Sequence, residues 1–177
     1  LQRKIFKRSS IGFLYIDKTS LNYHPDSTKT LYSAYNRNAG LEYNLASSNN
    51  IWTGKAFVLK SFQPGKTGND LAHAATLSYN SRNWNIVWQH EYVGNNYNTE
   101  VGYIPRQGYI RINPLVSRNF FPQRGNILSH GPQFSSSDYF DEGFRTTDNQ
   151  NSLSYLVTFR NRISLSGLIT HDYVELL

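Results

Sequence analysis

The chain has 177 residues, with 18 Lys and Arg against 12 Asp and Glu, which gives a net charge of +6 at pH 7. The absence of Cys excludes a disulfide framework and thiolate metal sites. An aromatic content of 15% argues against a disordered chain. The longest apolar runs, such as residues 56–59, are far shorter than the ~20 residues of a transmembrane helix.

The chain contains no Met and opens on Leu1-Gln2-Arg3-Lys4, which has no signal-peptide pattern. We therefore expect either a processed chain or a piece of a longer one.

Alternation of apolar and polar residues with a period of two recurs along the chain, whereas helical stripes are nearly absent. Leu77 and Tyr79, for example, would face one side of a strand, and Thr76 and Ser78 the other. In chain order the predicted strands cover residues 4–17, 31–46, 51–61, 71–80, 84–93, 109–120, 127–139, 152–160 and 164–175.

The connections between these strands alternate strictly between tight and long. The tight ones are residues 47–50, 81–83, 122–126 and 161–163, and the long ones are 18–29, 62–70, 94–108 and 140–151. Short turns at one end and long loops at the other are typical of outer-membrane β-barrels. A soluble β-sandwich lectin is the alternative, although Greek-key connections do not sort loop lengths so regularly.

Strand length and aromatic placement also favour a barrel. Ten residues tilted by ~45° cover ~23 Å, close to the ~25 Å apolar band of such proteins. Rings near the expected strand ends fit interfacial girdles, although aromatic residues are also good strand formers. They are Tyr15, Tyr43, Tyr79, Trp84, Tyr92, Phe120, Phe121 and Tyr173.

Nine strands is an odd number, whereas bacterial single-chain barrels have even counts. We therefore predict an all-β fold, an antiparallel up-and-down transmembrane β-barrel of which residues 1–177 are an internal, single-domain segment. The expected partners are outer-membrane lipid and the rest of the barrel, since an open sheet edge is costly in lipid.

Several sequence segments, taken together, resemble a known protein family. They are residues 35–40, 52–57, 77–84 and, most specifically, 96–106 with its continuation through residue 114. Together they resemble the uncharacterised C-terminal β-barrel domain of Bacteroidota outer-membrane proteins, which carry an N-terminal carbohydrate-binding-module-like domain. The resemblance implies a bacterial outer-membrane location and a link to surface glycans, but no catalytic mechanism. The carbohydrate-binding domain itself is not among these residues.

The five His residues show no metal-binding spacing. His90 and Glu91 are adjacent, so on a strand they would face opposite sides and could not share an ion. We expect no metal, no cofactor and no catalytic residues in this chain.

Carboxylates on the polar side of strands admit two interpretations. Glu42 and Glu91 could form a glycosidase pair, which requires a separation of about 5–9.5 Å. The simpler interpretation is a set of hydrogen-bonded residues facing a polar barrel lumen. That predicted lumen set is Glu42, Asn44, Gln89, Glu91 and Asp172.

The 94–108 loop and the strand after it carry the predicted ligand-binding residues. Tyr rings can stack on sugars, and Arg can bind carboxylate or phosphate with two hydrogen bonds. The residues are Tyr97, Tyr103, Arg106, Tyr109 and Arg111. The alternative is a purely structural loop that seals the barrel.

Three functions remain open from the sequence. The first is a barrel acting as membrane anchor, channel or component of a surface assembly with other outer-membrane proteins. The second is a surface glycan-binding protein or glycoside hydrolase, and the third is the soluble lectin. Nucleic acid is not an expected partner, because basic residues cluster at residues 3–8 but are scattered elsewhere in the sequence.

Overall fold

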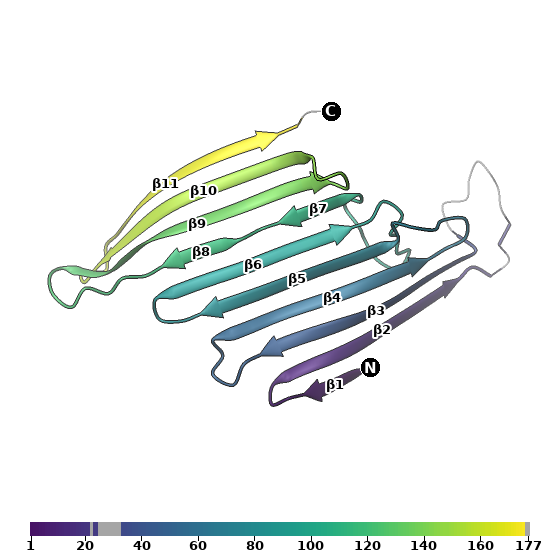
Figure 1. Ribbon diagram of the computed structural model, residues 1–177, viewed down its shortest axis with the longest axis horizontal. Coiled ribbons are helices and arrows are strands. Elements are labelled where there is room, and N and C mark those ends of the chain that lie inside the picture. Colours follow the sequence, from purple (N-terminus) through teal and green to yellow (C-terminus); the bar gives the residue numbers. More distant parts are fainter. Residues whose placement is uncertain (22, 25–32, 176–177) are drawn as a thin grey trace.

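The computed structural model describes residues 1–21, 23–24 and 33–175, which form one antiparallel sheet of eleven strands. The predicted all-β, antiparallel character is confirmed. The chain runs up and down, so each strand lies beside its sequence neighbour (Figure 1). Within the described ranges no helix is long and apolar enough to cross a membrane. The strands are β1 (Gln2–Ile5), β2 (Ser9–Thr19), β3 (Tyr35–Ala46), β4 (Trp52–Phe62), β5 (Leu71–Asn80), β6 (Trp84–Val93), β7 (Tyr109–Ile112), β8 (Leu115–Arg118), β9 (Ile127–Asp141), β10 (Thr146–Phe159) and β11 (Ser164–Val174).

Strands β7 and β8 occupy a single position in the sheet. Both pair with β6 and β9 in one continuous register, interrupted only at residues 113–114. Pro114 has no N–H to donate to the ladder, although its carbonyl still accepts the Ser136 N–H at 3.0 Å. The sheet therefore has ten positions, an even number, whereas the sequence predicted nine.

The additional position arises at the start of the chain. The predicted strand 4–17 is folded back on itself at residues 6–8, which separate β1 from β2. Phe6 takes a left-handed conformation there, with φ of 52°. The turn contains no Gly, Pro or Asn, so the residues gave none of the usual signals for a reversal.

The predicted long loop at residues 140–151 is also wrong. β9 and β10 pair almost to the turn, leaving only residues 142–145 between them. The Asp141 carboxylate closes this turn by accepting N–H bonds from Gly143 at 2.8 Å and Arg145 at 2.9 Å. Strict alternation of loop length thus fails, because residues 119–126 form a longer connection at the other end.

The remaining connections follow the prediction. The turns at residues 47–51 and 81–83 are tight, and those at 63–70 and 94–108 are long. Most of the predicted loop 18–29 lies outside the described residues. We call the end of the sheet with residues 63–70 and 94–108 the long-loop end and the opposite end the short-turn end.

The strand register sorts the side chains onto two faces of different chemistry. On the apolar face lie Phe13, Tyr15, Leu41, Val58, Leu77, Trp88, Phe134, Leu153 and Ile169. On the polar face lie Asn36, Glu42, Ser61, Thr76, Gln89, Glu91, Arg111 and Ser137. The alternation seen in the sequence is therefore a physical separation between the two sides of one layer.

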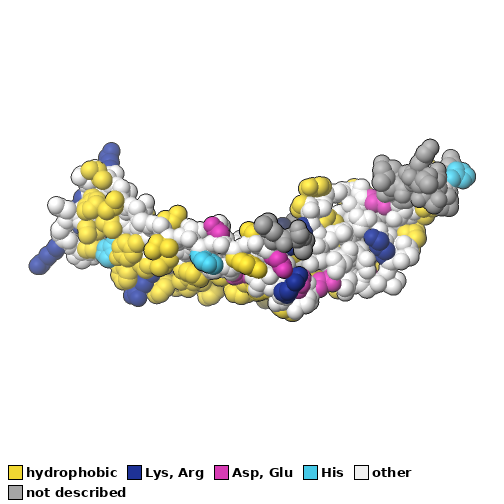
Figure 2. Space-filling view, turned by 90° about the horizontal axis from the view of Figure 1, so that it is seen from above, with side chains coloured by type: hydrophobic (Ala, Val, Ile, Leu, Met, Phe, Trp, Pro, Cys, Tyr) yellow, Lys and Arg dark blue, Asp and Glu magenta, His cyan; other side chains and the backbone are white. Residues whose placement is uncertain are grey.

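Burial in this sheet is the reverse of that in a water-soluble domain. On the apolar face, Phe13 is 49% exposed and Trp88 is 45% exposed. On the polar face Asn36 is fully buried, and Asn38 and Ser61 are nearly so. Seen from the β11 edge, the molecule is a thin bent layer with hydrophobic side chains gathered mainly along its lower, convex side (Figure 2).

Aromatic rings lie near both ends of the apolar face. Trp52 and Tyr79 contact each other at the short-turn end, with ring centroids 4.9 Å apart. Tyr92 stacks on His73 toward the long-loop end at 5.2 Å. Trp84 and Tyr92 are eight residues apart on β6, which corresponds to about 27 Å along the strand and ~20 Å after a tilt of ~40°.

Candidate ligand-binding site under the 94–108 loop

The 94–108 loop leaves β6 and returns to β7 through a tightly closed base. Gly108 donates its N–H to the Val93 carbonyl at 2.7 Å and has a φ of +69°. A Cβ at Gly94 would lie 2.2 Å from the Asn69 carbonyl oxygen, so this position admits only glycine without rearrangement. These two residues bring both ends of the loop together and let its middle extend over the sheet.

From this base the loop folds across the polar face and binds buried polar side chains of β3 and β4. Asn98 donates its backbone N–H to Ser61 Oγ at 3.1 Å. Asn36 donates from Nδ2 to the Asn98 carbonyl at 3.2 Å and accepts the Glu100 N–H on Oδ1, also at 3.2 Å. Gln63 Oε1 accepts a further bond from Asn98 Nδ2 at 3.1 Å. The loop therefore supplies the hydrogen bonds that these buried groups require.

Glu100 adds an ionic contact near the end of β2. Its carboxylate pairs with Lys18 and accepts the Ser33 N–H at 2.8 Å, and its side chain is only 8% exposed. Burial alone would raise the pKa of Glu100, but the bonds from Lys18 and Ser33 outweigh it and hold the pKa below its usual value. The ionised form of Glu100 therefore stabilises the folded loop.

A cleft of about 310 Å³ lies between the loop and the sheet. Phe57 and Leu59 belong to its wall on the sheet side, and Tyr97, Tyr103 and Pro105 to its wall on the loop side. A second, more polar hollow of about 210 Å³ adjoins it, because Ala74 and Glu91 line both. The site thus combines an apolar platform with hydrogen-bonding groups.

The tyrosines predicted to bind ligand have different surroundings. Tyr97 is 5% exposed, and burial raises the pKa of its phenol. Tyr109 is also buried and lines the cleft. Tyr103, in contrast, is 88% exposed, so it is the ring that the protein does not use for its own packing.

The two predicted arginines lie beside one another but are both engaged. Arg106 Nη1 is 3.0 Å from Asp148, and its guanidinium lies 5.3 Å from the centre of the Tyr139 ring. Arg111 contacts Glu91 at 3.5 Å and lies 5.1 Å from the same ring. Recognition of an anionic group by either arginine would have to displace a carboxylate.

The five residues predicted to face a lumen all project from the polar face, and four of them have polar partners there. Glu42 is 2.9 Å from Lys55 and accepts from Asn44 at 2.7 Å. Gln89 accepts from Asn113 at 3.0 Å, and Glu91 pairs with Arg111. Asp172, on β11, shares this face, opposite Gln150.

The strand register places Glu42 and Glu91 too far apart to act as a glycosidase pair. Glu42, Phe57, Ala74 and Glu91 are directly opposite one another on four successive strands. Three strand spacings of ~4.8 Å place the two glutamates about 14 Å apart. This exceeds the separation that either glycosidase geometry uses.

Comparison with known proteins yields no matching family model, no similar curated protein and no similar solved structure. The described residues also contain no group of three or more His, Asp or Glu side chains that could hold a metal ion.

The sequence did not identify the residues that anchor the loop. Asn36 and Ser61 were assigned only to strands and Gln63 to the loop 62–70, yet they are among the most buried side chains of the described residues. Asparagine is depleted in strands, so Asn36 and Asn38 near the start of β3 were the available signal.

Proposed function

We propose that this chain forms part of an outer-membrane β-barrel, in which the apolar face contacts lipid and the polar face lines the lumen. It would serve as membrane anchor, channel or component of a surface assembly. In this arrangement the 94–108 loop folds into the lumen and narrows it.

One observation carries this proposal. Large apolar side chains on nine neighbouring strand positions, from β2 to β11, are 38–73% exposed, while the most buried side chains on the other face are Asn36, Asn38 and Ser61. Water would penalise such a surface, whereas a bilayer favours it. A soluble β-sandwich would need a second sheet over this face, and the described residues form only one.

The two edge strands of the sheet are consistent with further strands of the same barrel on either side. Within the described residues, β1 pairs only with β2, and β11 pairs only with β10. Unpaired backbone groups at an edge cost several kcal/mol each in lipid, so the proposal requires partner strands from the rest of the barrel.

Membrane behaviour tests the proposal directly. The protein should require detergent to stay in solution, insert into lipid vesicles and migrate differently on a gel before and after heating. A monodisperse, folded protein in detergent-free buffer would contradict the proposal.

The cleft under the 94–108 loop supports a second candidate function, glycan binding at the mouth of the barrel. Tyr103 is exposed beside an apolar cleft of a size suited to a sugar ring. The family resemblance in the sequence also implies a link to surface glycans.

Binding of a panel of neutral and acidic oligosaccharides would test this function. Tyr103→Ala should weaken binding at least tenfold, as expected for loss of a stacking ring. Phe144→Ala removes another largely exposed ring, from the 142–145 turn at the same end, and should leave binding unchanged. Unchanged affinity in a folded Tyr103→Ala variant would rule out this site.

A further inference from the structure

Charge is divided between the two ends of the sheet. The segments at the short-turn end are residues 1–12, 43–54, 79–86, 116–129 and 157–166, and they contain no Asp or Glu. Their basic residues are Arg3, Lys4, Lys7, Arg8, Arg82, Arg118, Arg124, Arg160 and Arg162, all of them exposed. These nine residues are called the basic edge below. Basic residues that are scattered in the sequence are therefore gathered in space.

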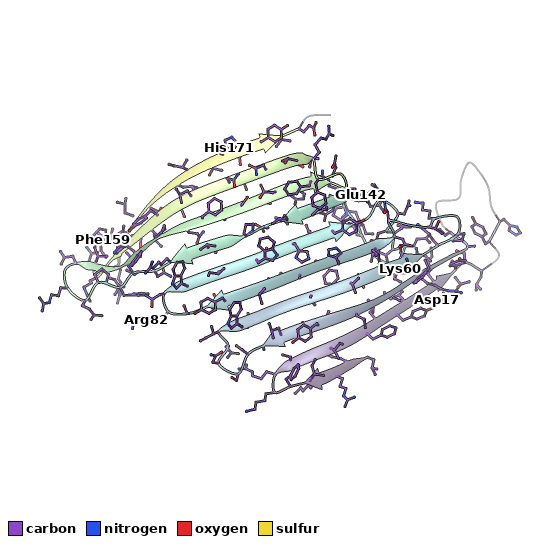
Figure 3. All side chains as sticks on the ribbon, viewed as in Figure 1. Asp17, Lys60, Arg82, Glu142, Phe159 and His171 are labelled. Carbon is purple, nitrogen blue, oxygen red and sulfur yellow. The ribbon has the colours of Figure 1, made fainter. Side chains whose placement is uncertain are left out.

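The opposite end contains both signs of charge and neutralises them. Arg37 pairs with Asp17 at 3.0 Å, and Lys60 with Asp70 at 2.6 Å. Figure 3 labels Asp17, Lys60 and Glu142 at this end and Arg82 at the other. Among the described residues, no ion pair includes any member of the basic edge.

Several arginines of the basic edge are held in place by neutral groups. Arg118 lies over the rings of Trp84 and Phe120, at 5.0 and 4.7 Å from their centres. Arg160 donates to the Gly125 and Pro122 carbonyls at 3.0 and 3.3 Å. These contacts fix the positions of the guanidinium groups but leave their positive charge uncompensated.

We propose that the basic edge binds the phosphate headgroups of anionic phospholipids in the leaflet that surrounds the short turns. This inference rests on the proposed barrel, since it needs the apolar face to be in lipid. Phosphate accepts paired hydrogen bonds from guanidinium. Trp84 and Tyr79 mark the interfacial depth at which headgroups lie.

Charge complementarity favours lipid over a free anion at this edge. The basic residues follow the turns along the width of the sheet, as a ring of headgroups would, and do not converge on one pocket. Exposed like charges within a Debye length of ~10 Å also repel one another unless anions are present. A leaflet supplies these anions at every turn.

Quenching of Trp84 by brominated lipids tests the inference. The protein carrying Trp52→Phe and Trp88→Phe retains Trp84 as its single tryptophan. It is reconstituted into phosphatidylcholine vesicles that contain phosphatidylglycerol, with bromine on one lipid or the other. The ratio of the two quenching curves gives the relative affinity of the edge for the anionic lipid.

Phosphatidylglycerol should be preferred severalfold over phosphatidylcholine. The double change Arg82→Gln and Arg124→Gln should bring that preference close to one, since a charge that contacts a headgroup contributes up to roughly fivefold. The matched control, Lys66→Gln with Arg145→Gln, removes two charges from the other end and should not lower it. Raising the salt concentration to about 1 M, where the Debye length is ~3 Å, should reduce the preference for phosphatidylglycerol in the protein that keeps Arg82 and Arg124.

The outcomes separate this inference from the proposed function. Equal quenching by both lipids in an inserted protein would overturn the inference and leave the barrel intact. A protein that enters neither type of vesicle would overturn both. The salt titration keeps the test decisive if the Arg82 and Arg124 variant fails to fold.

Discussion

The two faces of the sheet are built from the same strands yet satisfy opposite requirements. On β5, Leu77 is exposed on the apolar face, while its neighbour Thr76 lies beside Gln89 on the polar face. The polar face obtains its burial from the 94–108 loop rather than from a second layer. This chain therefore stabilises its sheet with a folded-in loop on one side and leaves the other side to the surrounding medium.

The strongest test of the comparison is a charge placed on each face of the same strand. Leu77→Arg should destabilise the membrane-inserted protein by about 2–4 kcal/mol, because an arginine near the bilayer midplane must leave water. Thr76→Arg should cost much less, since it enters the polar side. Chemical denaturation in lipid vesicles measures both, and equal losses would show that the faces do not differ in environment.

The next largest loss of stability is expected when a buried side-chain amide under the loop is removed. Asn36→Leu deletes the bonds to the Asn98 carbonyl and the Glu100 N–H, and should destabilise the closed loop by about 1–3 kcal/mol. Asn44→Leu, on the same face of β3 but away from the loop, is the control. Hydrogen exchange of residues 94–108 should accelerate only in the first variant.

Acid should open the same loop to a smaller extent. Because the pKa of Glu100 is lowered in the folded protein, its stabilisation is complete above the ordinary value of 4.5 and is lost as the pH falls through the lowered value. Hydrogen exchange of the loop should therefore speed up below that ordinary value. Glu100→Gln should abolish this pH dependence, and a dependence that persisted would assign the opening to another group.

The smallest effect is expected at Tyr103. Its ring is almost wholly exposed, so Tyr103→Ala should change the free energy of unfolding by no more than about 0.5 kcal/mol. Thermal or denaturant unfolding measures this directly. A larger loss would mean that Tyr103 is a packing residue and would weaken its assignment to ligand binding.

Sequence patterns predicted the antiparallel strands and the two faces because side-chain alternation is local information. They failed at residues 6–8 because the reversal there carries none of the usual turn signals, and at residues 140–151 because polarity was read as a proxy for a loop. The Phe6 turn contains no turn-forming residue, and the Thr-rich start of β10 is polar although it is paired.

The candidate site was only partly accessible to sequence reasoning. The 94–108 loop could be identified by its length and its tyrosines. Its anchors could not, because Asn36 and Ser61 are far from it in the sequence and their role depends on the path of the loop. The basic edge was hidden for the same reason, since its arginines come together only when the turns are placed side by side.

The up-and-down topology also has a consequence for how the sheet forms. With β7 and β8 counted as one strand, each strand of the described residues pairs only with the strands next to it in the chain, so each hairpin can close without a search among distant segments. Topologies dominated by such local pairing fold faster than those with long-range pairing. For a chain that leaves large apolar side chains exposed on one face, rapid hairpin-by-hairpin growth shortens the time for which strand edges stay unpaired.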